Sequence, residues 1–543
     1  MNSTIPFTDR SELLRNMREG KQCEWDVIIV GGGITGAGVL REAVRMGYRA
    51  LLVEQKDFSW GTSSRSSKMI HGGLRYLGSG DYKLTVHSLT ERERLLVEAP
   101  GLVDRMDFHF GMRKGVFPGR WLFSMLLWVY DRIAGVKSFG YCDAEESKQH
   151  FEGLGGDDLK GSCYYTDGIT DDSRLVMRVL QEGIEHGGSA LNYTKVESLI
   201  LEEGEVKGVY LQDLEEEAAG AATIELRAPV VINATGAWAD KLRNHVNSEK
   251  RVRPLRGSHL VIAGDRLPVA GVYSFFHPVD KRSVFVFPWE GATAIGTTDL
   301  DHTQDLDEEA SITPEEVSYL LDGVNGQFPQ KQISRDDVIS TWSGVRPVIG
   351  SEKSKDPSKE RRDHAVWSDK GLVTVSGGKL TTFRLIALDA LAAAETRLPQ
   401  PGKIVDDSIF SAVNISPEQL VPDDVAWGRR LLGRYGLGAQ ALLDAAPVHE
   451  HARIAETEFC LAECRWAIQH EATVHLDDLM LRRTRLGLLL PSGGEQLFSQ
   501  LAPLFRELVD WSESRWESEV ARYRDILQRY YSLPEDKGAN GNV

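Results

Sequence analysis

Three glycines near the start of the chain constrain its fold more than any other feature. Gly31, Gly33 and Gly36 form the pattern G-x-G-x-x-G. They stand between an apolar run at residues 26–30, which predicts a buried strand, and a helical pattern at residues 34–46. In this setting the glycines let the backbone approach a pyrophosphate at the positive end of the helix. The sequence therefore predicts a dinucleotide site.

An acidic residue supports the same interpretation. A second strand is expected at residues 50–53, and Glu54 follows it, 18 residues past Gly36. A carboxylate at this place can accept hydrogen bonds from an adenosine ribose, and it disfavours a 2′-phosphate. The pattern serves both FAD and NAD, so the βαβ unit alone leaves the cofactor open.

The chain has 543 residues, enough for two or three domains. Apolar runs at residues 230–234 and 372–376 are each followed by glycine and helical sequence, as expected for further strands of the first sheet. We therefore predict a discontinuous nucleotide-binding domain formed by residues 24–105, 166–255 and 340–400.

A second domain is predicted from alternating aromatic stretches. Residues 283–288 and 292–296, joined by a turn at Glu290-Gly291, predict an antiparallel sheet. We assign this sheet to a substrate-binding domain formed by residues 106–165 and 256–339.

Amphipathic helices dominate the last part of the chain. They are expected at residues 456–470, 476–490 and 495–531, in a C-terminal helical domain of residues 407–532. The polar residues 533–543 are expected to form a flexible tail.

Composition excludes several classes of protein. With 63 basic and 80 acidic residues, the net charge of −17 has the wrong sign for binding nucleic acid. The five cysteines are too few for a disulfide framework, which indicates a reducing compartment, and the start of the chain does not resemble a signal peptide. Cys460, Cys464 and His470 do not complete a tetrahedral set, so we expect no metal site.

A recognisable motif follows Glu54. The stretch GTSSRSSKMIHGGLRYL at residues 61–77 resembles the flavin-contacting loop of the FAD-dependent glycerol-3-phosphate dehydrogenases. Nearly the whole chain shares this resemblance, in the order of the family. The other matching motifs are DGITDDSRL (167–175), NATGAWAD (233–240), RPLRGSH (253–259), FPWEG and GTTD (287–299), GVRPVIG (344–350), SGGKLTTFR (376–384), CLAECRWAIQHE and DDLMLRRTRLG.

The resemblance implies a fold of class α/β + α. It is a glutathione-reductase-like FAD-binding fold with an antiparallel-sheet substrate domain and a C-terminal helical domain. It also implies FAD as the cofactor. The expected FAD contacts are the fingerprint residues Gly31, Gly33, Gly36 and Glu54; the hydroxyls of Thr62, Ser63 and Ser64 near the phosphates; Lys68, His71, Gly72 and Gly73 near the flavin ring; and Val196, Gly236, Gly378, Lys379, Leu380 and Thr381.

The implied reaction is the oxidation of sn-glycerol 3-phosphate to dihydroxyacetone phosphate. Oxidation of a secondary alcohol by flavin needs a base for the hydroxyl proton and cations for the phosphate. By resemblance Arg75, Tyr76, Arg346 and Lys379 line the substrate pocket, and we expect Arg346 and Lys379 to bind the phosphate. His259 is the first choice for the base because imidazole titrates near the working pH. A histidine that only orients the substrate is equally compatible with its position.

The electron acceptor must be external, because the sequence has no iron–sulfur or haem-attachment motif. The longest apolar run, residues 121–130, is about half of the ~20 residues of a membrane span. Basic residues flank it on both sides, so it is either an interfacial segment or a buried helix. The family resemblance favours the first and implies a homodimer at the cytoplasmic face of the inner membrane that passes electrons to membrane quinone.

Three alternatives remain open. An oxidase of the same family would pass the electrons to oxygen and release hydrogen peroxide. An amine or amino-acid oxidoreductase of related fold would also need an arginine, but Lys379 and the C-terminal motifs fit it poorly. A flavin-based redox sensor would keep the glycine fingerprint but would not need Arg75, His259, Arg346 and Lys379 together.

Overall fold

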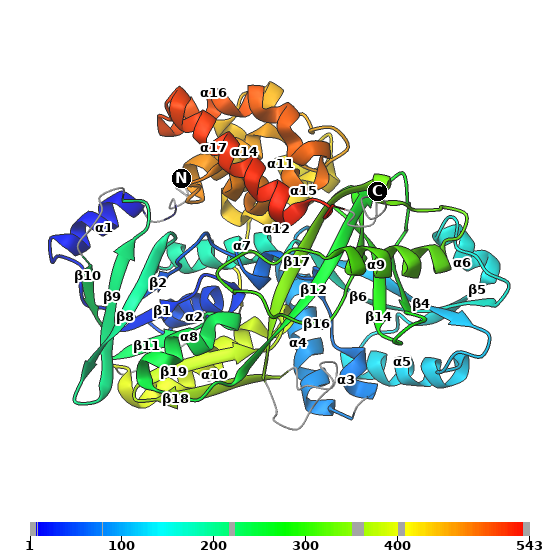
Figure 1. The fold of residues 1–543 in the computed structure, drawn as a ribbon, viewed down its shortest axis with the longest axis horizontal. Coiled ribbons are helices and arrows are strands. Elements are labelled where there is room, and N and C mark those ends of the chain that lie inside the picture. Colours follow the sequence, from blue (N-terminus) through cyan, green and yellow to red (C-terminus); the bar gives the residue numbers. More distant parts are fainter. Residues whose placement is uncertain are drawn as a thin grey trace, which may run out of the picture.

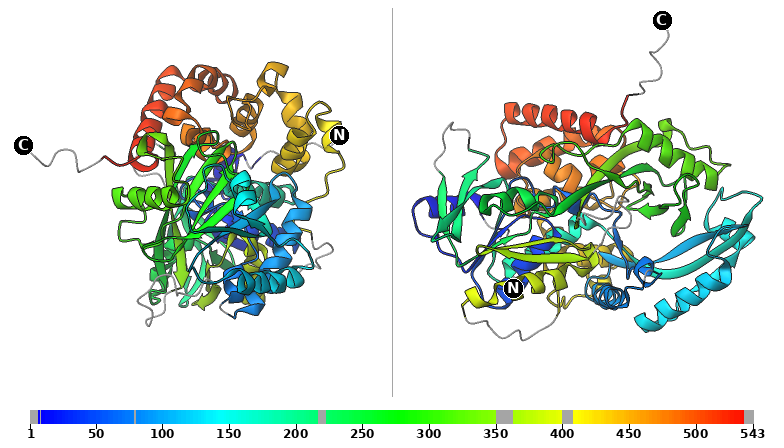
Figure 2. Two further views of the ribbon diagram at one scale, coloured as in Figure 1. Left: turned by 90° about the vertical axis from the view of Figure 1, so that its right-hand side faces the viewer. Right: turned by 60° about the horizontal axis from the view of Figure 1, so that its bottom comes forward.

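Two large sheets and a helical domain make up the protein (Figure 1). The computed structural model describes residue 7 and residues 9–78, 80–216, 223–349, 363–399 and 408–535, and of Arg75 the backbone only. The C-terminal helices pack on one side of the two sheets, as the further views show (Figure 2). The predicted fold class is confirmed. The predicted tail lies outside the described residues from residue 536 onward.

The first sheet is mainly parallel, with strand order β18-β19-β11-β1-β2-β7, and only β18 runs antiparallel to its neighbour. All four predicted strands of this sheet are confirmed as β1, β2, β11 and β19. Helices α2, α7 and α10 pack together beside it, and their apolar residues share one core with the sheet. The elements are β1 (Val27–Val30), α2 (Ile34–Arg45), β2 (Ala50–Val53), α7 (Asp172–Glu185), β7 (Ser189–Leu191), β11 (Val230–Asn233), β18 (His364–Asp369), β19 (Leu372–Gly377) and α10 (Phe383–Ala394).

The second sheet has ten strands, with order β16-β12-β15-β14-β13-β4-β6-β3, β17 beside β12 and β5 beside β6. The predicted hairpin is confirmed: β14 and β15 pair antiparallel, and Glu290 and Gly291 form the turn with positive φ. The strands are β3 (Met69–Ile70), β4 (Val103–Arg113), β5 (Gly140–Asp143), β6 (Leu159–Thr170), β12 (Val252–Ala263), β13 (Val272–Phe276), β14 (Ser283–Trp289), β15 (Ala292–Gly296), β16 (Leu300–Asp301) and β17 (Val338–Ile349).

The boundaries between the first two domains stay a prediction. Strands β3 and β17 pair within the second sheet, although their residues belong to segments that we assigned to nucleotide binding. A third, small sheet holds β8 (Thr194–Glu202), β9 (Glu205–Asp213) and β10 (Ile224–Arg227). The further helices outside the C-terminal domain are α1 (Arg10–Arg18), α3 (Leu74–Gly78), α4 (Tyr82–Glu98), α5 (Arg120–Ala134), α6 (Ala144–His150), α8 (Ala239–Arg243) and α9 (Pro314–Gln327).

The C-terminal domain departs from the predicted helices, which are shorter and interrupted. The helix expected at residues 476–490 is broken at Arg485 and the one at 495–531 at Asp510, both in the left-handed region. Amphipathic spacing continues across a single left-handed residue, so periodicity does not reveal the break. The elements are α11 (Pro417–Leu420), α12 (Val425–Tyr435), α13 (Ala439–Ala445), α14 (Leu461–His470), the π-helical segment Asp478–Arg483, α15 (Leu486–Leu489), α16 (Phe498–Val509), α17 (Glu513–Ile526) and the π-helical segment Leu527–Tyr531.

A buried histidine of the C-terminal domain contacts a carboxylate of that domain and one that follows strand β9 of the small sheet. His475 Nδ1 lies 2.8 Å from Glu519 on α17, and Nε2 lies 3.1 Å from Glu215, which follows β9. Burial opposes protonation, but the bonds to Glu215 and Glu519 outweigh it and raise the pKa of His475 to about 9. The imidazolium is therefore paired with two carboxylates at neutral pH.

Stability should consequently fall in alkaline solution. A folded-state pKa above the unfolded value of about 6.5 gives stabilisation that is complete below that pH and is lost as pH rises through 9. We expect a loss of roughly 2 to 3 kcal/mol between pH 6.5 and 9.5. Thermal unfolding of His475→Gln should show a flatter dependence on pH, whereas His186→Gln, on an exposed ring, should follow the unmodified protein. Parallel pH profiles for all three proteins would contradict the assignment.

Candidate flavin and substrate site

The fingerprint turn leaves no room for side chains at two of its glycines. Gly31 has φ 115°, and a Cβ there would lie 2.7 Å from the carbonyl oxygen of Ala234, the residue after β11. A Cβ on Gly36 would lie 1.9 Å from the Gly31 oxygen. Gly33 is the N-cap of α2, whose first-turn N–H groups face away from the helix. The turn is therefore compact enough for a pyrophosphate to reach the end of α2.

Glu54 lies against this turn. Its carboxylate accepts hydrogen bonds from the backbone N–H of Gly32 at 2.7 Å and of Lys56 at 2.8 Å. Burial raises the pKa of Glu54, and these hydrogen bonds oppose the rise. The carboxylate is thus held at the edge where the sequence predicts the ribose, and its contact with a ribose stays a prediction.

The hydroxyl cluster at residues 62–64 forms a short 3-10 helix beside the fingerprint. Ser63 Oγ accepts from the Ile34 N–H at 3.0 Å and so joins this segment to the first turn of α2. Thr62 Oγ1 donates to the Val345 carbonyl of β17, and Ser64 is buried. The predicted phosphate contacts therefore lie next to the fingerprint.

A second glycine pair approaches the same region from β19. Gly377 and Gly378 have φ of 83° and 79°, and Thr381 Oγ1 bonds with the backbone N–H and C=O of His71 at 3.2 and 3.3 Å. Ser376 Oγ donates to the Gly236 carbonyl at 3.1 Å. The structure thus brings together predicted cofactor residues that are more than 300 positions apart in the chain.

The remaining predicted cofactor residues lie around these segments. Gly72 is buried, and a Cβ there would collide with Leu89 and with the Tyr130 hydroxyl. Gly73 has φ 80°. Val196 lies on β8 and packs against the core that the small sheet shares with the first sheet, and Leu380 packs against the core of the first sheet.

Lys68 is directed into an interior ion pair. Its Nζ lies 2.9 Å from Asp172 Oδ1 and 4.6 and 4.5 Å from the centres of the Trp289 and Trp342 rings. Burial lowers the pKa of Lys68 to about 8, although Asp172 opposes the shift. A contact between this ammonium and the flavin ring stays a prediction, and the side chain has a structural partner that the sequence did not reveal.

Two of the predicted substrate residues are neighbours. Lys379 Nζ lies 4.2 Å from the centre of the Tyr76 ring and donates to Ser88 Oγ of α4 at 2.6 Å. A Cβ on Gly73 would lie 3.1 Å from the same Nζ, so this cation stands at the end of the predicted flavin loop. The predicted role of Arg75 lies outside the described residues, because only its backbone is described.

Arg346 is held on β17 by two residues of the loop after β15. Its guanidinium lies 3.1 Å from Asp299 Oδ1 and 3.0 Å from Thr297 Oγ1. The side chain keeps 29% of its exposure, so it remains accessible to a ligand. The sequence did not indicate Asp299. Its carboxylate balances part of the positive charge of Arg346, the residue that we expect to bind the phosphate.

His259 is buried on β12, with 1% of its surface exposed. Its ring stacks on Trp342 at 4.6 Å, and Nε2 lies 2.9 Å from Ser67 Oγ. Nδ1 is buried and has no hydrogen-bond partner within the part of the chain that the structure describes. Burial first, and then the positive charges of Arg346 and Lys68, lower the pKa of His259 well below its ordinary value. The imidazole is therefore neutral at neutral pH because of its surroundings. The choice of this residue from the sequence rested instead on the ordinary pKa of imidazole, near the working pH.

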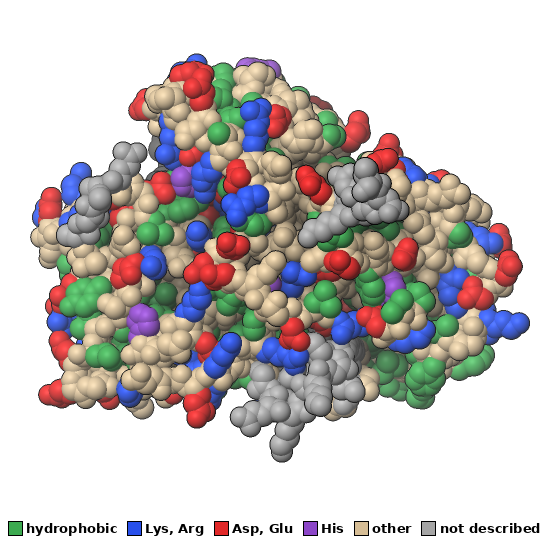
Figure 3. Space-filling model, viewed as in Figure 1, with side chains coloured by type: hydrophobic (Ala, Val, Ile, Leu, Met, Phe, Trp, Pro, Cys, Tyr) green, Lys and Arg blue, Asp and Glu red, His purple; other side chains and the backbone are tan. Residues whose placement is uncertain are grey.

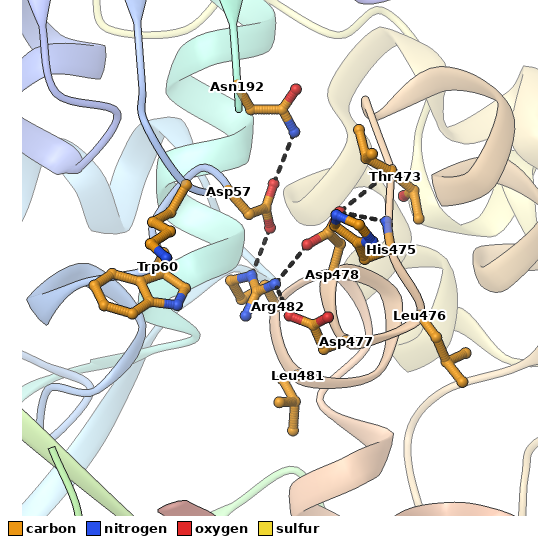
Figure 4. A network of polar contacts seen from close by, with 12 residues as sticks. Asp57, Trp60, Asn192, Thr473, His475, Leu476, Asp477, Asp478, Leu481 and Arg482 are labelled. Carbon is orange, nitrogen blue, oxygen red and sulfur yellow. Dashed lines mark hydrogen bonds and ion pairs between the residues drawn. The ribbon is translucent and has the colours of Figure 1, made fainter. Parts of the chain in front are cut away.

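A network of buried charges joins the segment after β2 to the C-terminal domain, and the sequence did not reveal it. Asp57, next to β2, accepts from Arg482 and Arg483, and Arg482 also contacts Asp477 and Asp478 (Figure 4). The motif DDLMLRRTRLG was the one signal for it. Charged residues on an amphipathic pattern ordinarily indicate a solvent-facing side, so the spacing alone did not reveal burial.

Comparison with known proteins decides the family. The family model for FAD dependent oxidoreductases matches residues 26–387, and the model for the C-terminal domain of alpha-glycerophosphate oxidase matches residues 409–516. The aerobic glycerol-3-phosphate dehydrogenase of Staphylococcus haemolyticus is 33% identical over 488 residues, which cover 85% of this chain and 86% of that protein. The chain belongs to the FAD-dependent glycerol-3-phosphate dehydrogenase family. The enzyme of that name from Bacillus subtilis is also 33% identical, over 89% of this chain and 90% of its own.

Solved structures agree with this assignment. Glycerol-3-phosphate dehydrogenase from Bacillus halodurans, complexed with FAD, is similar at a TM-score of 0.76 and 25% identity, covering 95% of this chain and 97% of its own. L-alpha-glycerophosphate oxidase from Mycoplasma pneumoniae has a TM-score of 0.57 and 16% identity over 72% of this chain and 99% of its own, which shows a shared fold. The prediction of an FAD-dependent enzyme of this family is confirmed, and FAD is its cofactor.

Proposed function

We propose that this enzyme oxidises sn-glycerol 3-phosphate to dihydroxyacetone phosphate and passes the electrons to membrane quinone. The observation that carries the proposal is a neutral, buried His259 near Arg346, in a chain whose relatives are named for this substrate. Burial keeps the imidazole able to accept a proton, and Arg346 offers a cation to an anionic substrate.

Each residue has one task in this proposal. FAD, when bound, accepts the hydride that leaves the carbinol carbon. A ring nitrogen of His259 takes the hydroxyl proton, and Arg346, fixed by Asp299 and Thr297, donates to the phosphate. Lys379 adds a second cation from beside Tyr76. Burial of His259 keeps water from its ring and strengthens the electrostatic effect of the nearby charges on the substrate.

The acceptor is tested by adding glycerol 3-phosphate to the yellow protein without oxygen and following the flavin absorbance. Bleaching with glycerol 3-phosphate, but not with glycerol or amino acids, followed by rapid recovery only with a quinone analogue, is the expected result. Equally rapid recovery with oxygen would favour the oxidase, which the match of the C-terminal domain to an oxidase model keeps in view. No bleaching at all would remove the substrate assignment.

The exposed apolar face of helix α5 supports the proposal that the enzyme meets quinone at a membrane surface. Trp121, Met125 and Trp128, three or four positions apart, are 82%, 59% and 50% exposed, whereas Leu127 and Tyr130 on the other side are buried. Figure 3 shows apolar side chains gathered at the end of the molecule where Figure 1 places α5. No helix among the described residues is long and apolar enough to span a membrane. One face of the helix is therefore buried, and its exposed apolar face supports the proposed contact with a membrane interface.

Basic residues border the apolar face of α5, as in segments that lie in a membrane interface. The Arg120 guanidinium lies 5.4 Å from the Trp121 ring, and the Arg132 guanidinium lies 5.3 Å from the Trp128 ring. Such cations suit anionic lipid headgroups. Location at the cytoplasmic face of the inner membrane and assembly as a homodimer belong to the same proposal, and both rest on the resemblance to the family.

Replacing Trp121 and Trp128 by serine should release the enzyme from membranes. Each tryptophan buried in an interface contributes on the order of 1 kcal/mol or more, so the double variant should bind vesicles about tenfold less tightly or worse. The measurement is cosedimentation with vesicles of phosphatidylcholine and phosphatidylglycerol. The control is Val448→Ser, an 83% exposed apolar residue of the C-terminal domain. Unchanged cosedimentation of the double variant would rule out α5 as the contact.

A further inference from the structure

Residues 59–72, which include most of the predicted flavin loop at residues 61–77, are contacted repeatedly by one short segment, residues 167–175. Ser59 Oγ lies 2.5 Å from Ser173 Oγ, and Thr170 N–H donates to the Lys68 carbonyl at 2.8 Å. Strand β3 pairs with the end of β6, and Gly72 N–H donates to Asp167 at 3.2 Å. The motif DGITDDSRL, which the substrate chemistry does not use, therefore contacts this stretch at several points between Ser59 and Gly72.

Asp172 is the centre of this attachment. Its Oδ2 accepts from the Ser66 N–H at 2.9 Å and from Ser66 Oγ at 2.7 Å, and its Oδ1 pairs with Lys68. Its side chain has no exposed surface. A carboxylate that satisfies three donors of one tight turn fixes the path of that turn.

The C-terminal domain reaches the same carboxylate. Arg485 donates to Asp172, lies 3.1 Å from Asp171, and donates to the Ser64 carbonyl at 3.1 Å. Arg485 has φ 59° and lies between the π-helical segment Asp478–Arg483 and α15. One arginine thus bonds both to the loop and to the carboxylate that holds the loop.

The loop also contacts the candidate base. Ser67, between the two residues that Asp172 binds, has its Oγ 2.9 Å from His259 Nε2. Ser66 accepts from the indole N–H of Trp342, on which the His259 ring stacks, at 3.2 Å. A shift of the loop would therefore move both the predicted FAD contacts and the partner of His259.

We propose that Asp172 and Arg485 are positioning residues, through which the C-terminal domain holds residues 64–68 in the conformation that binds FAD and orients His259. The proposal rests on the proposed assignment of residues 61–73 to the flavin. Neither residue needs to touch FAD or substrate. In this arrangement the C-terminal helical domain completes the cofactor site rather than only covering it.

The test compares Asp172→Asn and Arg485→Lys with a matched control. Displacement of reacting groups by about 1 Å can cost about 100-fold in rate, so we expect kcat at saturating FAD to fall at least about tenfold with little change in the KM for glycerol 3-phosphate. The FAD dissociation constant, measured by flavin fluorescence without substrate, should rise by about tenfold. The control is Glu450→Gln, which weakens the buried pair of Glu450 with Arg465 at 2.8 Å, away from the loop; it should leave both quantities near those of the unmodified enzyme.

The outcomes separate this proposal from the assignment beneath it. If both variants retain FAD and turn over like Glu450→Gln, or if all three lose FAD to the same extent, Asp172 and Arg485 have no positioning role. Arg485→Lys keeps a cation near Asp171 and Asp172, so it provides the measurement should Asp172→Asn fail to fold. A separate variant, Gly33→Val, tests the FAD site itself, because a Cβ there would lie 3.1 Å from Ser63 Oγ. Retention of FAD by Gly33→Val would overturn the site assignment whatever the other variants do.

Discussion

Asp57→Asn should lower the free energy of unfolding by about 3 to 5 kcal/mol, the cost typical of breaking a buried ion pair. Asp57 has no exposed surface, and it accepts from Arg482 and from both terminal nitrogens of Arg483 at 2.5 to 2.8 Å. Burial alone would raise the pKa of this carboxyl, but Arg483 and Arg482 hold it below its usual range. An amide cannot balance these charges, so the guanidinium of Arg483 would be left buried without an anion.

The measurement is thermal or urea unfolding of the enzyme with FAD bound. A matched control is Glu495→Gln, whose partner Arg524 and own side chain are both partly exposed, and we expect that variant to lose about 1 kcal/mol or less. Because the folded-state pKa of Asp57 is depressed, its contribution is present above the unfolded pKa and is lost as the solution becomes acidic through the folded value. Equal losses for the two variants would show that the Asp57 network does not stabilise the joint between the domains.

The first sheet could be predicted from the sequence because local signals and the global fold agree there. Four short apolar runs, each ending at a polar residue or glycine, correspond to β1, β2, β11 and β19. The glycines are required by contacts that the structure shows, such as the close approach of Gly36 to Gly31. Strands of a parallel sheet that are buried on both faces are nearly continuous apolar runs, which are easily recognised in a sequence.

The C-terminal helices could be predicted only in outline. Arg485 and Asp510 adopt left-handed conformations that their residue types do not demand. Tertiary contacts decide these breaks, and at Arg485 the break accompanies the bonds to Asp171 and Asp172. A local pattern carries no information about partners more than 300 positions away.

The candidate site was predicted as a set of residues but not as an arrangement. The resemblance to a family supplied His259, Arg346 and Lys379, whereas their partners Ser67, Asp299 and Ser88 came only from the structure. The burial of His259 also came from the structure, and it changes the reason for choosing this residue. A buried imidazole stacked on Trp342 and facing two cations is neutral by its environment, not by its ordinary pKa.

His259→Asn should slow reduction of the flavin by glycerol 3-phosphate about 100-fold or more, the usual contribution of a general base. Substrate binding should change much less, because Arg346 and Lys379, not His259, are proposed to bind the phosphate. The rate is followed as loss of flavin absorbance after rapid anaerobic mixing, and its dependence on substrate concentration separates binding from reduction. Burial is the main cause of the lowered pKa of His259, and the positive charge of Arg346 adds to it. When the phosphate of the substrate lies against Arg346, this second contribution weakens, which favours proton uptake by the imidazole.

A matched variant distinguishes loss of a base from loss of a buried ring. His109 lies on β4 of the same sheet, is buried beside Ser162, and has its pKa lowered to about 4 by burial, but it contacts none of the proposed substrate residues in the contacts described. His109→Asn should therefore reduce the flavin at nearly the unmodified rate. If the flavin of His259→Asn is also reduced at that rate, His259 is not the base. An unchanged substrate dissociation constant would then exclude the substrate-orienting role as well. If reduction slows only through weaker binding, His259 orients the substrate and another group accepts the proton.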